Sequence, residues 1–118
     1  MHLLNFFNTF NDGSTATPGC FPSGGDSDCR GANSQVEYDR QLAKTVAAIL
    51  GTQADVVGLV EMENDGYGAS SALQALVDTL NAQAGPGTYA FIDVDAGVGQ
   101  VNALGTDAIK VAMIYKPA

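Results

Sequence analysis

Positive charge is scarce in this sequence, and the scarcity limits what the protein can bind unaided. Only five of 118 residues are Lys or Arg, against 13 Asp or Glu, so the net charge at pH 7 is −8. The five cations are scattered along the chain: Arg30, Arg40, Lys44, Lys110 and Lys116. Proteins that coat nucleic acid regardless of sequence use clustered cations, so this class is excluded. An enzyme of this composition that acts on phosphates would need a divalent cation to bring the substrate near its carboxylates.

Long apolar runs are also lacking. No stretch approaches the roughly 20 residues of a membrane-spanning helix, and the first residues do not form a charged leader followed by an apolar core. We therefore expect no membrane partner. The composition, 46% hydrophobic and 15% charged, is that of one modest globular domain. A domain of this size buries only about two thirds of its unfolded surface, so the loss of a packing partner would weaken it strongly.

Cysteine is limited to Cys20 and Cys29, which enclose a polar, Gly-rich segment of eight residues. This pattern favours a disulfide that closes a loop, and hence an oxidising compartment; two free thiols are the alternative. The same region contains three acidic residues that could hold Ca²⁺, namely Asp12, Asp26 and Asp28. Their spacing is irregular, so solvated loop acids are the simpler interpretation.

Apolar periodicity predicts an α/β (α+β) domain with the order β-α-β-α-β-β. Residues 2–7 are expected to form the first strand. A capping box from Ser34 to Glu37 begins an amphipathic helix that ends at Gly51. Residues 55–60 form an apolar run without polar alternation, which predicts a strand covered on both faces.

The second half of the chain continues the alternation. A helix is expected to begin at Ser70 or Ser71 and to end at residues 85–87. Residues 89–94 read as a third strand, followed by a Gly-rich loop of turns. Residues 108–115 form the last strand, with Lys110 on the opposite side from the apolar residues Ile109, Val111, Met113 and Tyr115.

Glu61 is the strongest candidate for chemistry. It directly follows an apolar strand, where open α/β sheets bind ligands, and Mg²⁺ prefers carboxylate oxygens. If the extended conformation continues, Glu63 lies on the same face, and the two carboxylates would repel each other unless a cation or proton intervened. The alternative is a Glu that is simply solvated or paired with a Lys.

Four segments, residues 3–8, 55–65, 106–111 and 114–117, occur in an order that resembles bacterial extracellular nucleases of the endonuclease/exonuclease/phosphatase family, the deoxyribonuclease-I-like proteins. The similarity extends over essentially the whole chain. The Cys20 to Cys29 loop resembles that of the secreted branch. The resemblance implies a bacterial extracellular or periplasmic hydrolase. It would use Mg²⁺ or Mn²⁺ to hydrolyse DNA or RNA by in-line attack of water.

The resemblance also implies roles for individual residues. Glu61 matches the family's metal-binding, catalytic Glu, and Asp107 lies near the acidic residue that orients the catalytic His. Asn64 lies beside Glu61 as a substrate-binding candidate, and Asn5 resembles a secondary pocket residue of the substrate site or a structural residue. His2 stands where the family carries an active-site Asn, which is a departure from the pattern.

The family fold is a four-layer αββα sandwich, and residues 1–118 correspond to its amino-terminal half. The catalytic His pair and two further motifs of the family belong to the other half and do not occur here; the chain contains only His2. We therefore expect an inactive fragment whose partner is the missing carboxy-terminal half. Exposed sheet surface, with residues 108–115 as the edge, could make it self-associate. The alternative is a secreted, non-catalytic binding domain that retains the scaffold.

Overall fold

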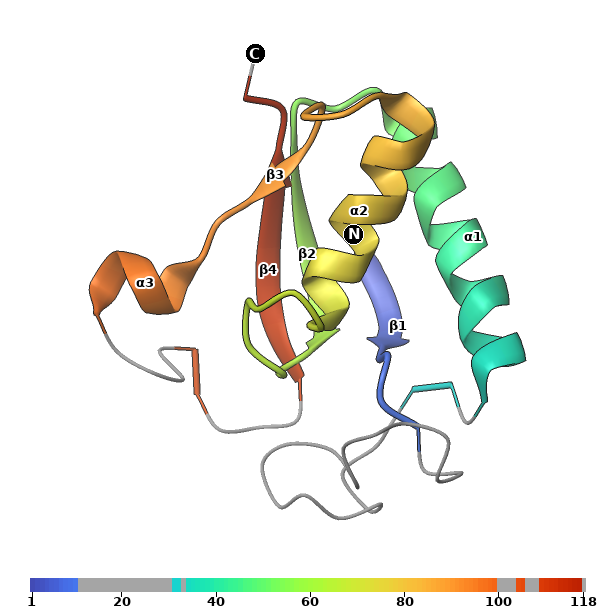
Figure 1. Cartoon of the computed structure of the whole chain (residues 1–118), viewed down its shortest axis with the longest axis horizontal. Helices are drawn as coiled ribbons and strands as arrows, with labels where there is room; N and C mark the ends of the chain where they lie inside the picture. Colours follow the sequence, from blue (N-terminus) through green and yellow to red (C-terminus); the bar gives the residue numbers. More distant parts are fainter. Residues whose placement is uncertain (11–30, 33, 100–103, 106–108, 118) are drawn as a thin grey trace.

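The computed structural model describes residues 1–10, 31–32, 34–99, 104–105 and 109–117. These residues form a mixed α/β structure of four strands and three helices, in the order β1 (His2–Phe6), α1 (Gln35–Thr52), β2 (Val56–Glu63), α2 (Ala72–Ala84), β3 (Ala90–Phe91), α3 (Val94–Val98) and β4 (Ile109–Tyr115). The sheet order is β1-β2-β4-β3 (Figure 1). β1 is parallel to β2, whereas β4 is antiparallel to both of its neighbours.

The helix starts follow the predicted capping residues. The Ser34 hydroxyl accepts a hydrogen bond from the Glu37 amide, and the Ser71 hydroxyl accepts one from the Gln74 amide. α2 ends at Gly85 as expected. The predicted end of α1 at Gly51 is wrong, because the helix continues to Thr52 and Gln53 adopts the left-handed conformation of its C-cap.

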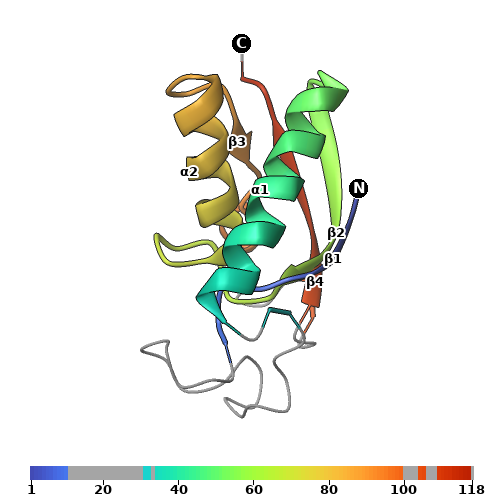
Figure 2. The ribbon, with the colours of Figure 1, turned by 90° about the vertical axis from the view of Figure 1, so that its right-hand side faces the viewer.

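The core lies between the sheet and the two long helices, which cover the same face of the sheet (Figure 2). α1 contributes Tyr38, Val46 and Ile49, and the buried side of α2 packs beside them. The fully buried large side chains of this layer include Phe6, Leu59, Met62, Leu73, Leu76, Leu80 and Ile114. Burial of such side chains contributes about 1.5–3 kcal/mol each and holds the two layers together.

The other face of the sheet corrects a prediction. β2 was expected to be covered on both faces, but Val56 and Val60 are 58% and 42% exposed, whereas Val57 and Leu59 are buried under the helices. β4 shows the predicted alternation, yet Val111 is exposed and Lys110 is buried. Among the described residues, helices cover one face only, so alternate residues of β2 and β4 remain in contact with solvent.

The region before β4 also differs from expectation. β3 is only two residues long, and residues 94–98, expected to be strand end and loop, form α3. The Asp93 side chain accepts a hydrogen bond from the Ala96 amide at 2.9 Å, an N-cap that the sequence interpretation missed. β4 is not a simple edge strand, because β3 pairs with it at Ile114 and Tyr115.

Candidate functional site

β1 and β2 both depart from regular pairing close to Glu61. Between the pairs His2–Val60 and Phe6–Met62, β1 advances four residues while β2 advances two. On the other side of β2, the register between Leu59–Ala112 and Met62–Lys110 also shifts, so β2 has one additional residue opposite β4. Bulges of this kind redirect side chains and are frequent next to active sites.

Left-handed backbone conformations are concentrated at the same place. Leu4, Asn5 and Glu61 have φ values of 55°, 56° and 67°, and Gln53 at the end of α1 is the only other non-glycine residue of the described chain with positive φ. Such residues cost about 1–3 kcal/mol each and persist only where the surrounding contacts impose them. Backbone strain of this kind clusters at functional sites, so the region around Glu61 is the leading candidate for the functional site of this chain.

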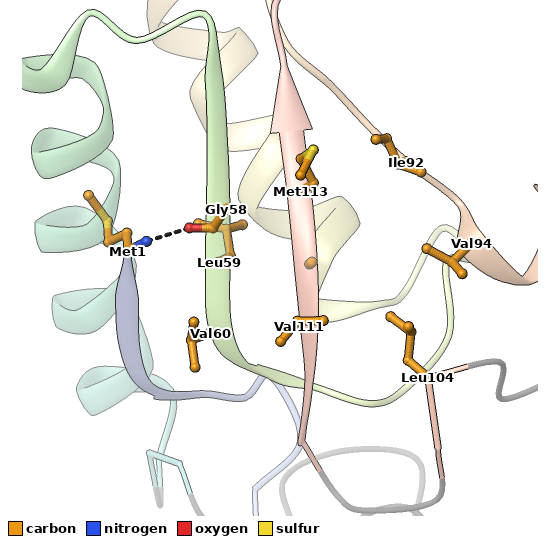
Figure 3. Close-up of a pocket in the computed structure, with 10 residues that line it drawn as sticks. Met1, Gly58, Leu59, Val60, Ile92, Val94, Leu104, Val111 and Met113 are labelled. Carbon is orange, nitrogen blue, oxygen red and sulfur yellow. Dashed lines mark hydrogen bonds between the residues drawn. The ribbon is translucent and has the colours of Figure 1, made fainter.

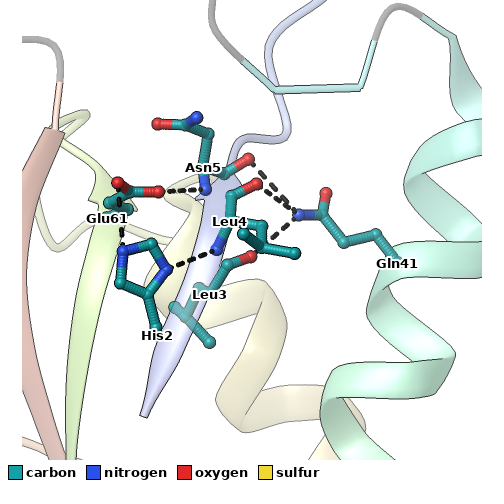
Figure 4. Close-up of polar contacts among 6 residues, drawn as sticks. All are labelled: His2, Leu3, Leu4, Asn5, Gln41 and Glu61. Atoms are coloured by element: carbon teal, nitrogen blue, oxygen red, sulfur yellow. Dashed lines mark hydrogen bonds and ion pairs between the residues drawn. The ribbon is translucent and has the colours of Figure 1, made fainter.

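The Glu61 carboxylate is held by the bulged strand β1 (Figure 4). The Asn5 amide donates a hydrogen bond to Oε2 at 2.9 Å, and His2 Nε2 lies 3.2 Å from Oε1. His2 Nδ1 accepts a hydrogen bond from the Leu4 amide at 3.4 Å, which assigns the ring proton facing Glu61 to Nε2. The side chain of Glu61 is 23% exposed, so its orientation is constrained while solvent still reaches it.

Glu63 does not share this environment, contrary to the extended arrangement considered from the sequence. The left-handed Glu61 interrupts the alternation of side chains, and Glu63 is buried at 1% exposure. Its Oε1 accepts hydrogen bonds from the amides of Asn8 and Thr9 at 2.9 and 3.2 Å. Burial raises the pKa of Glu63, opposed by these hydrogen bonds and by Lys110. Glu63 therefore anchors the chain that leaves β1.

A second polar cluster fixes the loop between β2 and α2. Both carboxylate oxygens of Asp65 lie 3.1 Å from the Ala72 amide nitrogen at the start of α2. Burial, and then the charge of Glu63, raise the pKa of Asp65 to about 7. Lys110 Nζ donates to the Gly66 carbonyl at 2.9 Å and lies 3.7 Å from the centroid of the Tyr67 ring. Burial lowers the pKa of Lys110, opposed first by Asp65.

The remaining predicted residues lie in different places. Asn64 is buried, and its Nδ2 donates to the Gly105 carbonyl at 3.1 Å, so it connects the β2–α2 loop to the segment before β4. Asn5 meets Glu61 through its backbone amide. Several predicted residues lie outside the described part of the chain, namely Asp12, Cys20, Asp26, Asp28, Cys29 and Asp107.

The structure adds residues that the sequence interpretation did not assign to the site. His2 was noted only as a departure from the family pattern, and Lys110 only as the polar side of the last strand. Gln41, whose side-chain amide contacts the backbone of β1, was not considered. Residues that contact a bulge cannot be recognised from periodicity, because a bulge adds residues to a strand and so breaks its period-2 pattern of side chains. The capping role of Asp65, seven residues before the first residue of α2, is also a tertiary contact rather than a local motif.

Glu61 has the chemistry of a first metal ligand. Within residues 1–10, 31–32, 34–99, 104–105 and 109–117, no group of three or more His, Cys, Asp or Glu side chains could hold a metal ion. A carboxylate has about four lone-pair sites, and Glu61 uses one for Asn5 and faces His2 with the other oxygen. Mg²⁺ binds proteins through one or two carboxylates plus water and phosphate. Glu61 therefore fits a divalent cation as a partial site, and His2, whose Nε2–H faces Oε1, orients the carboxylate and is not itself a ligand.

Comparison of the chain with protein-family models, curated proteins and solved structures found no match in any of the three. Among the described residues, no helix combines the length and the apolar character needed to cross a bilayer.

Proposed function

We propose that this chain is the amino-terminal half of a secreted, metal-dependent phosphodiesterase, a nuclease of the endonuclease/exonuclease/phosphatase family. The observation that carries the proposal is the conformation at Glu61. A carboxylate in a strand is ordinary, but a left-handed Glu61 held at a double bulge opposite two further left-handed residues, Leu4 and Asn5, is not explained by packing.

Glu61 is the residue that would hold Mg²⁺ or Mn²⁺ in this function. The bound ion would neutralise phosphate charge and so compensate for the net charge of −8, which otherwise repels nucleic acid. The chain's own contribution is orientation, because the Asn5 amide and His2 fix both oxygens of the carboxylate before the ion binds. Asp107, in the segment before β4, is proposed as a further acidic residue of the site, and Asn64 and Asn5 as its substrate-side residues.

The uncovered face of the sheet supports the proposal that another layer belongs on it. Met1, Gly58, Val60, Val111 and Met113 line a hollow of about 490 Å³ on this face (Figure 3). The hollow also involves Leu59, Ile92, Val94, Leu104 and Ala112. A sheet face in permanent contact with water usually alternates to polar residues, whereas this one is apolar. We assign it to the second sheet of a four-layer αββα sandwich, supplied by the carboxy-terminal half.

Metal binding at Glu61 can be measured on the 118-residue chain itself. The chain contains one histidine, so its imidazole proton resonances are unique, and a Mn²⁺ ion on Glu61 would lie close to that ring. We expect Mn²⁺ to broaden these resonances, Mg²⁺ to reverse the effect, and Glu61→Gln to weaken it by at least about tenfold. Glu37→Gln, the same charge change on the exposed first turn of α1, is the matched control and should leave the broadening unchanged.

A plasmid-nicking assay in the same buffers tests the activity. We expect no cleavage by the 118-residue chain alone, since a metal ligand without a general base cannot align water and phosphate. Metal-dependent cleavage that Glu61→Gln abolishes would show that the chain carries a complete site. If Mn²⁺ broadens His2 equally in the parent and in Glu61→Gln, or not at all, the metal site is refuted. A secreted binding domain that uses the apolar face then becomes the better interpretation.

A further inference from the structure

One side chain of α1 contacts the backbone of the β1 bulge directly. Gln41 Nε2 lies 3.1 Å from the Leu3 carbonyl oxygen, 3.1 Å from that of Leu4 and 3.4 Å from that of Asn5 (Figure 4). Three successive carbonyl oxygens converge on one amide group because Leu4 and Asn5 are both left-handed. In a regular strand, successive carbonyls point in alternate directions and could not share a donor.

The orientation of the Gln41 amide follows from its surroundings. Rotation of the amide by 180° would place Oε1 against three carbonyl oxygens, so the NH₂ group must face the bulge. Oε1 is then buried without a hydrogen-bond partner, and no other buried side-chain oxygen or nitrogen of the described residues is in that position. An unsatisfied buried acceptor lowers stability, so an apolar side chain would be the better choice if this position served packing alone.

The geometry points to a positioning role, and we infer that Gln41 holds the left-handed β1 bulge that aims the Asn5 amide at Glu61 Oε2. Without a donor, the converging carbonyl dipoles repel one another, and Leu4 and Asn5 relax toward the extended region. That relaxation turns the Asn5 N–H away from Glu61 and frees the carboxylate to rotate. The expected effect of Gln41 on metal binding rests on the proposed function. Its effect on the contact between Asn5 and Glu61 does not depend on that function.

Amide hydrogen exchange isolates this effect because the chain contains an internal control. The amides of Asn5 and Asn8 each donate to a Glu carboxylate at 2.9 Å, but only Asn5 lies in the bulge that Gln41 contacts. In Gln41→Met, which keeps the length of the side chain and removes its donors, we expect exchange at Asn5 to accelerate roughly tenfold relative to Asn8. Gln35→Met is the matched control on α1, because the Gln35 amide donates to exposed Asp39, within the same helix, and its loss should leave Asn5 unchanged.

Rescue and metal titration complete the test. In Gln41→Lys, an ammonium group with three N–H donors replaces the amide, and we expect slow exchange at Asn5 to return. Mn²⁺ affinity at Glu61 should fall about tenfold in Gln41→Met. If exchange at Asn5 and Asn8 accelerates equally, or at neither, Gln41 is only a structural residue and the inference is overturned. If exchange at Asn5 accelerates as expected but Glu61→Gln leaves Mn²⁺ affinity unchanged, the proposed function fails and the positioning role of Gln41 stands.

Discussion

At the scale of single residues, Asp65 makes the stability of the fold depend on pH. Its carboxylate lies at the start of α2, and burial together with the charge of Glu63 raises its pKa from 3.8 to about 7. The folded chain therefore binds this proton more tightly than the unfolded chain does. The stability that the protonated carboxyl contributes is fully present below about pH 4 and is lost as the pH rises through about 7.

We predict that Asp65→Asn removes this dependence. Between pH 4 and pH 8, the free energy of unfolding of the parent should fall by on the order of 3 kcal/mol relative to the variant. Urea unfolding at a series of pH values measures the difference. Asp78→Asn, which removes one exposed carboxylate from α2, controls for the change in net charge. Parallel pH profiles for the parent and Asp65→Asn would contradict the assignment.

At the scale of elements, the bulge of β1 is packed against residues that precede α1. A Cβ atom on Gly31 would lie 2.6 Å from Phe7 Cβ and 2.7 Å from the Asn5 carbonyl oxygen, so only glycine allows this approach. The contact places backbone directly behind the Glu61 site. The conformation of β1 is thus supported from two directions, by Gln41 and by Gly31.

Two Gly→Ala substitutions should have opposite effects on stability. Gly31→Ala is expected to lower the free energy of unfolding by about 1–3 kcal/mol, because the backbone behind Asn5 must shift. Gly51→Ala lies within α1, where an added Cβ meets no atom of the described residues within 4 Å, and should raise it by about 0.5–1 kcal/mol. Denaturant unfolding of the parent and of both variants measures these changes in the free energy of unfolding. A neutral Gly31→Ala would mean that the close approach is not a constraint.

At the scale of the whole molecule, the sheet presents an apolar face without a helix layer over it in the described residues. Val111 and Met113 are both exposed there, while Ile114, on the opposite side of β4, is fully buried. Substitutions on the two faces should therefore separate association from stability. The double substitution Val111→Thr and Met113→Gln changes only the uncovered face.

We expect this double variant to sediment as a monomer at concentrations where the parent chain self-associates. Its free energy of unfolding should stay within about 0.5 kcal/mol of the parent value, as for other surface positions. Ile114→Ala, on the covered side of the same strand, is the matched control and should cost about 2–5 kcal/mol. Sedimentation velocity and urea unfolding provide the two measurements. A large loss of stability in the double variant would mean that the face is already covered within the chain.

Local sequence signals predicted the two long helices and most of the strands but not the bulges of β1 and β2. Ser34 marked the start of α1 correctly, and Ser71 was one of two candidates for the start of α2, since a capping hydroxyl acts on amides only two or three residues away. β2 and β4 were recognised from their apolar runs. Which side of β4 is buried was not predicted, because Lys110 becomes a core residue only through the Gly66 carbonyl and the Tyr67 ring.

The predicted place of Glu61 just beyond a strand was wrong, because β2 continues to Glu63. The sequence by itself determined the α/β class and the approximate extent of α1, α2, β2 and β4. These features depend on period and on neighbours within one or two turns, which a linear sequence displays. Only the tertiary structure decided that Glu61 is left-handed, that Asn5 and His2 orient its carboxylate, and that Gln41 supports Asn5 from behind. These contacts join residues between 36 and 59 positions apart, and strained backbone persists only where such distant partners impose it.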